Sequence, residues 1–590
     1  MPTYSAPLKD YQFIIDHFLE LDKHADLKGV AEAREMAQPL LEASAQLCEE
    51  VLFPLNMVGD KQGLKFKDGT VTTPDGFREA YTQYIEGGWP TLTWPTEFGG
   101  QDLPEFLNMP MLEMVCSANL SFGLTPGLTH GAIHALVVYG SDEQKQKFLP
   151  GMISGKWSGV MCLTEPVAGT DLGLLKTRAT PNGDGSYRIE GNKIFISAGE
   201  QDQTENIIHL VLARLPDAPK GSKGISLFVV PKFMVHDDGS LGERNKFVCG
   251  AIEHKMGIHA SPTCVMNYDG ATGYLVGKPH EGLKAMFVMM NTARLYVGVQ
   301  GLGVGEAAYQ NALAYTKERL QGRALTGAKQ PDKPADPITV HPDVRRMLHS
   351  MKCFTEGSRA LVMETALKID IAHRHEDPNV RQEADDFVQL VTPILKSTLT
   401  DGGFETASTA MQCFGGYGYI EEYGASQYLR DARIPMIYEG TNGVQAMDLV
   451  GRKLPTDTGR YLKRFFHPVD QFITEHRADS AMAEFTKPLK AHLKYLQQAT
   501  MWIGTMGFVN PNHAGAGAVE YQKMFSLVLF AWLFARQAKL ALALRDQDPD
   551  FYDQKLATCR FFFTKLLPQT TGLLASITAG ADPVMAEAGF

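Results

Sequence analysis

The sequence predicts an α+β protein in which a β domain is inserted between helical regions. Apolar residues recur at helical spacing through residues 1–158, as at Phe13, Phe18 and Leu21. Short apolar runs and period-two alternation, separated by Gly, Asn and Asp, then occupy residues 159–277. Helical spacing returns at residue 278 and continues to the C-terminus. These observations predict four domains: N-terminal helical (1–158), central antiparallel β (159–277), helical (278–452) and additional helical (453–590).

The N-terminal region also contains a predicted connection and a predicted helix start. Residues 89–100 form a Gly- and Pro-punctuated connection between helices. Ser141 precedes Asp142 and Glu143, a pattern typical of a capped helix start, and Pro150 is expected to end that helix.

The β region and the helical regions after it show equally simple patterns. Tyr187 and Ile189 alternate with polar residues, and turn clusters such as 182–185 separate the apolar runs. A long helical segment is expected from Arg294 to Arg319, followed by a Pro-containing loop over 336–341.

Composition excludes several classes of function. The chain has 590 residues, 44% hydrophobic and 21% charged, which indicates an ordinary soluble protein with more than one core. The net charge of −11 argues against nucleic acid or an anionic membrane as the main partner. The 8 cysteines and 17 histidines show no metal-ligand spacing, so we expect no metal site and reduced cysteines in a cytoplasmic protein.

No membrane or export signal is expected either. The N-terminus lacks the basic and apolar regions of a signal peptide. The longest apolar run, residues 524–535, is too short to span a bilayer and predicts a buried helix in the last domain, so we expect no integral membrane segment.

The segment from Ile437 to Asp448 carries the strongest candidate for chemistry. Its carboxylate, Glu439, follows an apolar dipeptide and precedes two glycines, which let the backbone approach a ligand closely. Thr441 and Asn442 predict the N-cap of the next helix. A carboxylate in apolar surroundings at a helix entrance suits a general base. A plain turn before a surface helix is the alternative interpretation.

The residues Ile437-Tyr-Glu-Gly-Thr-Asn442 resemble the catalytic glutamate segment of acyl-CoA dehydrogenases, which are flavin enzymes. The resemblance implies a helical domain, a β domain and a C-terminal four-helix bundle, with Glu439 as the base. Small members of the family end near the equivalent of residue 452. The continuation to residue 590 resembles the larger bacterial members, including the 3-methylmercaptopropionyl-CoA dehydrogenase type, which have an added helical domain.

Two further motifs resemble the flavin contacts of the same family. The first, Met161-Cys-Leu-Thr-Glu-Pro-Val-Ala-Gly-Thr-Asp171, resembles its flavin-contacting loop, and the second, Lys193-Ile-Phe-Ile-Ser-Ala-Gly199, resembles the strand whose aromatic ring covers the flavin. Donors aimed at a reduced flavin favour hydride acceptance. The resemblance implies FAD contacts from Met161, Leu163, Thr164, Gly169, Thr170, Phe195 and Ser197, with Thr170 also near the thioester arm.

The remaining contacts implied by the resemblance lie in the second half of the chain. The segments 317–323 and 412–419 resemble those that meet the FAD pyrophosphate of a neighbouring subunit, which implies at least a dimer. We expect a homodimer, with the added C-terminal helices on the surface that small members use to form tetramers. The FAD-contacting residues there are Arg319, Gln321, Gln412, Gly415, Gly416, Thr441 and Gly443. Asn291, Arg294 and Gly440 are implied to contact the acyl-CoA. An arginine on a solvated helix face is the alternative for Arg294.

The resemblance implies FAD-dependent conversion of an acyl-CoA to the 2,3-enoyl-CoA, with an electron-transfer flavoprotein as acceptor. The resemblance to the larger bacterial members suggests 3-methylmercaptopropionyl-CoA as the substrate, converted to methylthioacryloyl-CoA. The alternatives are a general fatty acyl-CoA dehydrogenase, an acyl-CoA oxidase that uses O₂, and a non-catalytic scaffold that binds FAD and CoA. Other acids could serve as a base by residue type alone, namely Glu165, Glu318, Glu421 and Glu422. The glycines at 301, 303 and 305 resemble a dinucleotide-binding loop, but close helix packing explains them better because no strand precedes them.

Overall fold

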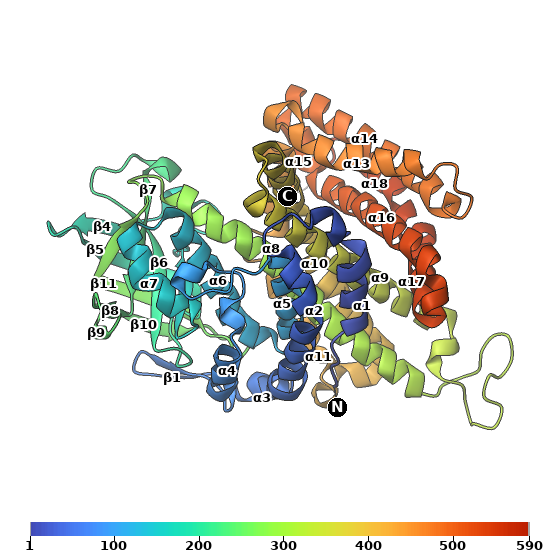
Figure 1. Cartoon of the computed structure of the whole chain (residues 1–590), viewed down its shortest axis with the longest axis horizontal. Helices are drawn as coiled ribbons and strands as arrows, with labels where there is room; N and C mark the ends of the chain where they lie inside the picture. The colour runs from blue at the N-terminus through green and yellow to red at the C-terminus, as the bar shows by residue number, and fades with distance from the viewer. Residues whose placement is uncertain (1, 588–590) are drawn as a thin grey trace. The chain divides into compact units, whose positions relative to one another are not determined.

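The computed structural model describes residues 2–587 of the chain, which divides into two compact units. The bundle unit comprises Met1–Glu42, Glu105–Glu113 and Val297–Phe590, and the sheet unit comprises Ala43–Pro104 and Met114–Tyr296. Figure 1 shows the helices and strands along the chain. One boundary between the units lies at the start of α5 (Glu105–Ala118), and the other three fall within helices, namely α2 (Val30–Gln46), α5 and α8 (Gly282–Glu318). The predicted α+β class is confirmed, while the division into four domains stays a prediction.

The sheet unit is built on a seven-stranded sheet. The strand order is β10-β11-β5-β4-β6-β3, and β7 joins β11 to β6, so that five of the strands form a closed circuit. Its strands are β3 (Trp157–Cys162), β4 (Arg178–Pro181), β5 (Tyr187–Ser197), β6 (Asn206–Arg214), β7 (Ile225–Pro231), β10 (Phe247–Ile252) and β11 (Thr263–Val276). Two small hairpins complete the strands, β1 (Lys65–Lys67) with β2 (Thr70–Thr72) and β8 (Phe233–Val235) with β9 (Leu241–Arg244).

The sheet is mixed, whereas the sequence predicted an antiparallel one. Strands β3 and β4 run parallel to β6, and the other pairs are antiparallel. A parallel pair needs a long connection, and the chain between β3 and β6 supplies one that contains β4 and β5. Alternation within each strand marks antiparallel and parallel pairs alike, so it does not reveal strand direction.

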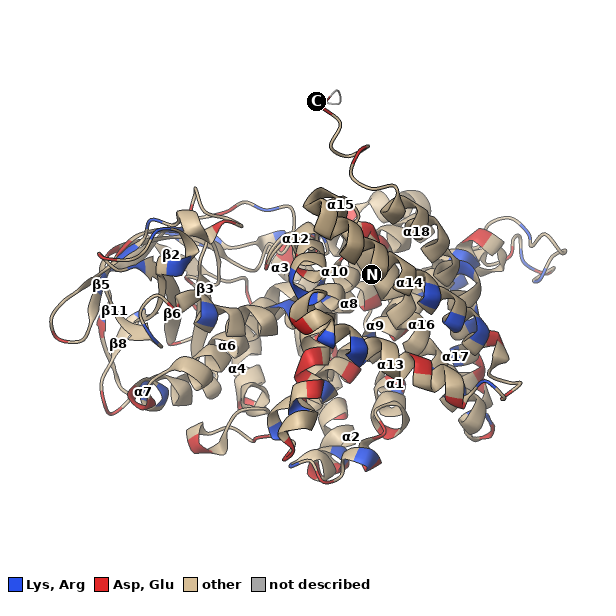
Figure 2. Cartoon of the chain, turned by 90° about the horizontal axis from the view of Figure 1, so that it is seen from above, with Lys and Arg blue, Asp and Glu red and all other residues tan. Residues whose placement is uncertain are grey.

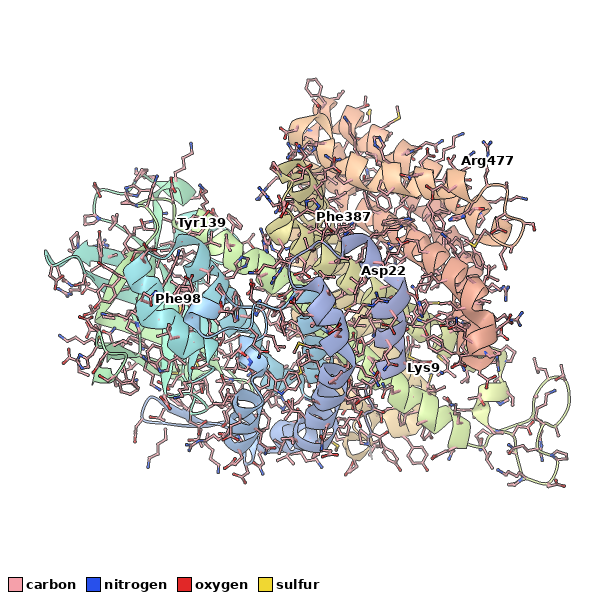
Figure 3. The ribbon with its side chains drawn as sticks, viewed as in Figure 1. Lys9, Asp22, Phe98, Tyr139, Phe387 and Arg477 are labelled. Atoms are coloured by element: carbon pink, nitrogen blue, oxygen red, sulfur yellow. The ribbon has the colours of Figure 1, made fainter. Side chains whose placement is uncertain are left out.

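Strands β6 and β7 are buried on both faces because they separate two cores. Leu227 and Val229 of β7 pack in one core with helices α6 (Leu120–Tyr139) and α7 (Asp142–Ile153), to which Phe98 also contributes (Figure 3). Phe228 and Val230 point into the other core, which the strands enclose. The predicted start of α7 is confirmed, since the Ser141 hydroxyl accepts a hydrogen bond from the Gln144 amide at 3.2 Å. The predicted end at Pro150 is wrong, because α7 continues through this proline to Ile153, which costs the helix one backbone hydrogen bond. The unit also contains α3 (Pro54–Gln62) and α4 (Phe77–Glu86).

The bundle unit packs long helices closely together. Its first helices besides α2, α5 and α8 are α1 (Leu8–Phe13), α9 (Pro342–Arg374), α10 (Pro378–Phe414), α11 (Ala425–Asp431) and α12 (Asn442–Asp448), and further helices follow after residue 459. A Cβ on Gly301 of α8 would lie 2.3 Å from the Leu399 carbonyl oxygen of α10, and one on Gly305 would lie 2.7 Å from the Phe354 ring of α9, so close helix packing explains these two glycines. Helix α8 begins at Gly282, upstream of the predicted Arg294, because the apolar residues between them continue the helix.

The last helices of the chain surround α16 (Ala518–Leu544). They are α13 (Arg460–Glu475), α14 (Ala483–Val509), α15 (Pro511–Ala516), α17 (Pro549–Phe561) and α18 (Thr570–Thr578). Within residues 2–587, α16 is the one helix long and apolar enough to cross a membrane, but 61% of its most apolar window is buried inside the protein. Phe525 and Trp532 of α16 pack on Phe465 of α13, as in the core helix of a bundle. The predicted buried helix over 524–535 is therefore confirmed, within a longer element.

A buried charge cluster connects the helices of the bundle unit. Figure 2 shows acidic and basic residues interspersed along the helices, but Arg359 of α9 is 2% exposed. Its guanidinium donates to Glu113 of α5 at 2.6 Å, to Glu306 of α8 at 2.9 Å and to Asp10 of α1. Lys555 of α17 also pairs with Asp10. Burial raises the pKa of Glu113 to about 7, although Arg359 opposes the shift.

We predict that Arg359→Met lowers the free energy of unfolding by about 3–5 kcal/mol, because it leaves buried carboxylates without their cation. Urea unfolding at several pH values measures the loss, which should shrink as the pH falls because protonation neutralises those carboxylates. Arg34→Met is the control, since Arg34 pairs with the exposed Asp22 (Figure 3). Equal losses from both variants would contradict the prediction.

Candidate functional site

Glu439 lies in a tight turn between the short helix Ile434–Met436 and α12. Its φ is +56° and that of Gly440 is +85°, so two successive residues adopt the left-handed conformation. Such a backbone is strained for a residue that has a Cβ. Thr441 caps α12, because its side chain accepts a hydrogen bond from the Val444 amide at 3.4 Å, as predicted. The Glu439 side chain is half-buried.

Buried polar side chains hold this turn from one side. The ammonium of Lys396, in α10, donates to the Gly440 carbonyl at 3.0 Å and to Asn442 Oδ1 at 2.8 Å. The side-chain nitrogen of Gln445, Nε2, donates to the backbone carbonyls of both Glu439 and Gly440 at 3.2 Å. Lys396 and Gln445 are both fully buried. The turn is thus fixed by donors from α10 and α12.

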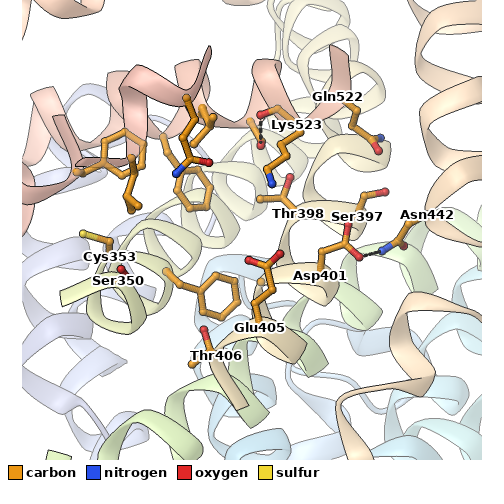
Figure 4. A pocket seen from close by; sticks show the side chains of 18 of the residues that line it. Ser350, Cys353, Ser397, Thr398, Asp401, Glu405, Thr406, Asn442, Gln522 and Lys523 are labelled. Atoms are coloured by element: carbon orange, nitrogen blue, oxygen red, sulfur yellow. Dashed lines mark hydrogen bonds between the residues drawn. The ribbon is translucent and has the colours of Figure 1, made fainter. Parts of the chain in front are cut away.

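The same network reaches a cavity of about 290 Å³ in the bundle unit. Asn442 Nδ2 donates to Asp401 Oδ1 at 2.6 Å, and Figure 4 shows Asp401, Glu405 and Lys523 around the cavity. Burial raises the pKa of Asp401 above its ordinary value, although the hydrogen bond from Asn442 opposes the shift. Helices α9, α10, α12 and α16 all contribute to the walls of the cavity.

A second cavity, of about 600 Å³, brings together the predicted phosphate contacts. Arg319, Gln321, Gln412, Gly415 and Gly416 all line it, although they come from segments about 90 residues apart in sequence. Arg319 follows the end of α8 and lies over the Tyr417 ring, 5.4 Å from its centre. Added Cβ atoms on the two glycines would meet nothing within 4 Å. A guanidinium beside open glycine backbone suits a phosphate group.

The predicted flavin loop of the sheet unit is held by a buried ion pair. Lys193 of β5 donates to Glu165 at 2.9 Å and to the Leu163 carbonyl at 2.9 Å. Glu165 also accepts hydrogen bonds from Lys176 and Thr177. Burial raises the pKa of Glu165, but Lys193 and these hydrogen bonds outweigh it, so the pKa is lowered. Glu165 is therefore an ionised structural carboxylate and no candidate base.

The aromatic residue predicted to cover the flavin is exposed on a strained backbone. Phe195 has a φ of +59°, and 59% of its surface is exposed. The register of β5 against β11 shifts here, so that two residues of β5 oppose one of β11. A β-bulge of this kind redirects side chains. Ser197 ends the same strand, and Gly169 and Thr170 are exposed in the loop.

The remaining predicted site residues differ in whether their side chains are buried or exposed. The Met161 side chain is buried in the core between the sheet and helices α6 and α7, so this residue could contact a flavin only through its backbone. Arg294 is buried, so the interpretation that put it on a solvated face is wrong, and it donates to Asn291 at 3.4 Å. Glu318, Glu421 and Glu422 are exposed. Among residues 2–587 no group of His, Cys, Asp or Glu is arranged to hold a metal ion.

Sequence reasoning missed the buried donors of the turn. Lys396 directly follows Ile394 and Leu395 on a helix, and a lysine next to apolar residues of a core face is a signal for a buried, paired charge. Gln445 and Lys193 offered no comparable signal, because their partners are distant in sequence or are backbone atoms.

Comparison with known families covers most of the chain. Models of the acyl-CoA dehydrogenase N-terminal, middle and C-terminal domains match residues 40–156, 160–271 and 280–454. A model described as acetyl-CoA dehydrogenase C-terminal like matches residues 465–587. The added helices therefore have a family description of their own.

Individual proteins match over nearly the full length. A 3-methylmercaptopropionyl-CoA dehydrogenase from Ruegeria pomeroyi is 42% identical over 99% of both chains. A broad-specificity linear acyl-CoA dehydrogenase from Mycobacterium tuberculosis is 32% identical over 100% of both. The solved structure of an acyl-CoA dehydrogenase complexed with FAD from Bacillus anthracis superposes with a TM-score of 0.74 at 19% identity, covering 92% of this chain and 88% of that one.

Proposed function

The chain belongs to the acyl-CoA dehydrogenase family, and on this premise we propose that it converts an acyl-CoA thioester to the 2,3-enoyl-CoA with FAD as cofactor. The turn at Glu439 supports the proposal most strongly. It holds a half-buried carboxylate on a backbone that buried donors fix from one side. Such preorganisation is what a general base requires.

Residues within each unit fit the cofactor. The open glycine backbone and guanidinium at Arg319 suit a pyrophosphate, and the exposed ring of Phe195 suits an aromatic ligand. The proposed FAD contacts are Leu163, Thr164, Gly169, Thr170, Phe195, Ser197, Arg319, Gln321, Gln412, Gly415, Gly416, Thr441, Gly443 and the Met161 backbone. FAD, when bound, would accept a hydride from the β-carbon of the substrate.

The proposed role of Glu439 is to take the α-proton of the thioester. That proton is weakly acidic, so the transition state needs hydrogen bonds to the thioester oxygen, one of them from the Glu439 amide. Asn291, Arg294, Thr170 and Gly440 are the proposed acyl-CoA contacts. Exclusion of water would favour proton transfer to the carboxylate.

The proposed substrate is 3-methylmercaptopropionyl-CoA, which the 42% identity to the Ruegeria pomeroyi enzyme supports. A general fatty acyl-CoA dehydrogenase is the second candidate, favoured by the similarity to a broad-specificity enzyme. We further propose a cytoplasmic homodimer that passes electrons to an electron-transfer flavoprotein. An oxidase that uses O₂ instead would turn over faster with O₂ than with an artificial acceptor.

We predict that Glu439→Gln retains FAD and binds acyl-CoA but bleaches the flavin about 10²–10⁴-fold more slowly, because the base is lost. Anaerobic mixing of the holoenzyme with substrate, followed by flavin absorbance, measures the rate. The exposed Glu422→Gln is the matched control and should bleach at the wild-type rate. Normal bleaching by Glu439→Gln would remove Glu439 from this role.

A substrate panel tests the specificity. We expect kcat/KM to be highest for 3-methylmercaptopropionyl-CoA among that thioester and butyryl-, octanoyl- and palmitoyl-CoA. A clear preference for one of the straight-chain substrates would favour the second candidate instead.

A mixed dimer tests the sharing of FAD between chains. We predict that Arg319→Ala lowers FAD retention, whereas the control Arg477→Ala, on an arginine at the surface (Figure 3), does not. Co-expression of the Arg319→Ala and Glu439→Gln chains should restore roughly half of the wild-type turnover per mixed dimer, because one of its two sites is complete. No recovery, or a tetramer mass by light scattering, would contradict the shared-site homodimer.

A further inference from the structure

Lys396 is a charged side chain buried completely beneath the turn that carries Glu439. It lies in α10 among other buried residues, where an ammonium is stable only if its donors are satisfied. Two of its acceptors, the Gly440 carbonyl and Asn442 Oδ1, belong to the turn and to the first residue of α12. The lysine therefore connects α10 to both sides of Thr441.

The turn needs such a support because its backbone is strained at Glu439. Glutamate in the left-handed conformation is disfavoured by its Cβ, and it persists only when the surrounding structure holds it. The carbonyls of Glu439 and Gly440 both accept hydrogen bonds from the buried side, from Gln445 and, at Gly440, also from Lys396. These contacts fix the orientation of two successive peptide groups.

Because each peptide unit is planar, hydrogen bonds that fix its carbonyl also fix the direction of its N–H group. In a trans peptide the N–H points away from the C=O, and the described chain has no cis peptide. The amides of Gly440 and Thr441 therefore point away from Lys396 and Gln445. The direction in which the Glu439 side chain leaves the backbone is set by the same dihedral angles.

The network continues from Lys396 through Asn442 to a carboxylate. Asn442 accepts from Lys396 through its oxygen and donates to Asp401 through its nitrogen. Asn442 Nδ2 also donates to Thr400 Oγ1 at 3.0 Å. The asparagine is thus held in one orientation, with its oxygen toward the lysine.

We propose that Lys396 is a positioning residue, which, together with Gln445, holds the left-handed backbone at Glu439 so that the carboxylate meets the substrate α-carbon. The inference rests on the proposed function, in which Glu439 takes the α-proton. Lys396 acts through the Gly440 carbonyl and Asn442 and needs no contact with substrate. A charged donor suits this role because hydrogen bonds from an ammonium are stronger than those from a neutral group.

The test is Lys396→Met in the full-length holoenzyme. We expect the single-turnover rate of flavin bleaching, per bound FAD, to fall about 100-fold, because a small displacement of a catalytic group has an effect of that size. The FAD content and the dissociation constant for acyl-CoA should stay close to wild type. Lys396→Arg, which retains the charge and the donors, should recover part of the rate.

Lys555→Met is the matched control. Lys555 is equally buried in the same unit, but it pairs with Asp10 and Glu356, away from the turn. We expect this variant to be less stable to urea and to bleach at the wild-type rate per bound FAD. If the two methionine variants slow bleaching equally, loss of a buried lysine merely loosens the fold and the inference is wrong.

A second variant keeps the test decisive if Lys396→Met does not fold. Gln445→Leu removes the other donor to the same carbonyls without removing a charge, and it should slow bleaching with unchanged acyl-CoA binding. A wild-type rate in the folded Lys396→Met or, failing that, in Gln445→Leu would overturn the inference. Absence of bleaching in the wild type would instead overturn the proposed function.

Discussion

The left-handed turn at Glu439 and Gly440 is the constraint on which the rest of the bundle unit depends for its chemistry. A strained backbone keeps its conformation only on a rigid support, and α10 supplies that support through Lys396. Helix α10 is in turn packed against α8 so closely that glycine is required at Gly301. The long helices therefore do more than enclose a core, since they hold the backbone around one carboxylate.

The added C-terminal helices strengthen the same support. Gln522 of α16 donates to the Pro393 carbonyl of α10 at 3.0 Å, about one turn before Lys396. Arg536 of α16 pairs with Glu364 of α9 at 2.9 Å, and Lys555 of α17 joins the cluster around Arg359. The last helices are thus attached to α9 and α10 by polar contacts that are mostly buried. A cavity remains where α16 meets α9 and α10, beside Asn442.

The sequence predicted the parts of the molecule that local patterns encode. Helical spacing, the cap at Ser141 and the Thr441 cap of α12 all depend on residues a few positions apart, and all were found. The parallel direction of β3 and β6 was not predictable, because alternation is the same in either direction. The role of Glu165 was also missed, since this residue lies in a loop and its partner Lys193 lies on β5, distant in sequence. The phosphate contacts around Arg319 were expected from family resemblance alone, and long-range packing brings these residues together in one cavity.

The central claim is that Glu439, held on this turn, removes a proton from the carbon next to a thioester. Exchange of that proton with solvent tests the claim most directly. The holoenzyme would be incubated anaerobically with acyl-CoA in D₂O, and deuterium at the α-carbon would be followed by NMR. The account predicts exchange with the wild type and almost none with the Glu439→Gln variant. Exchange at the wild-type rate without the carboxylate would contradict it.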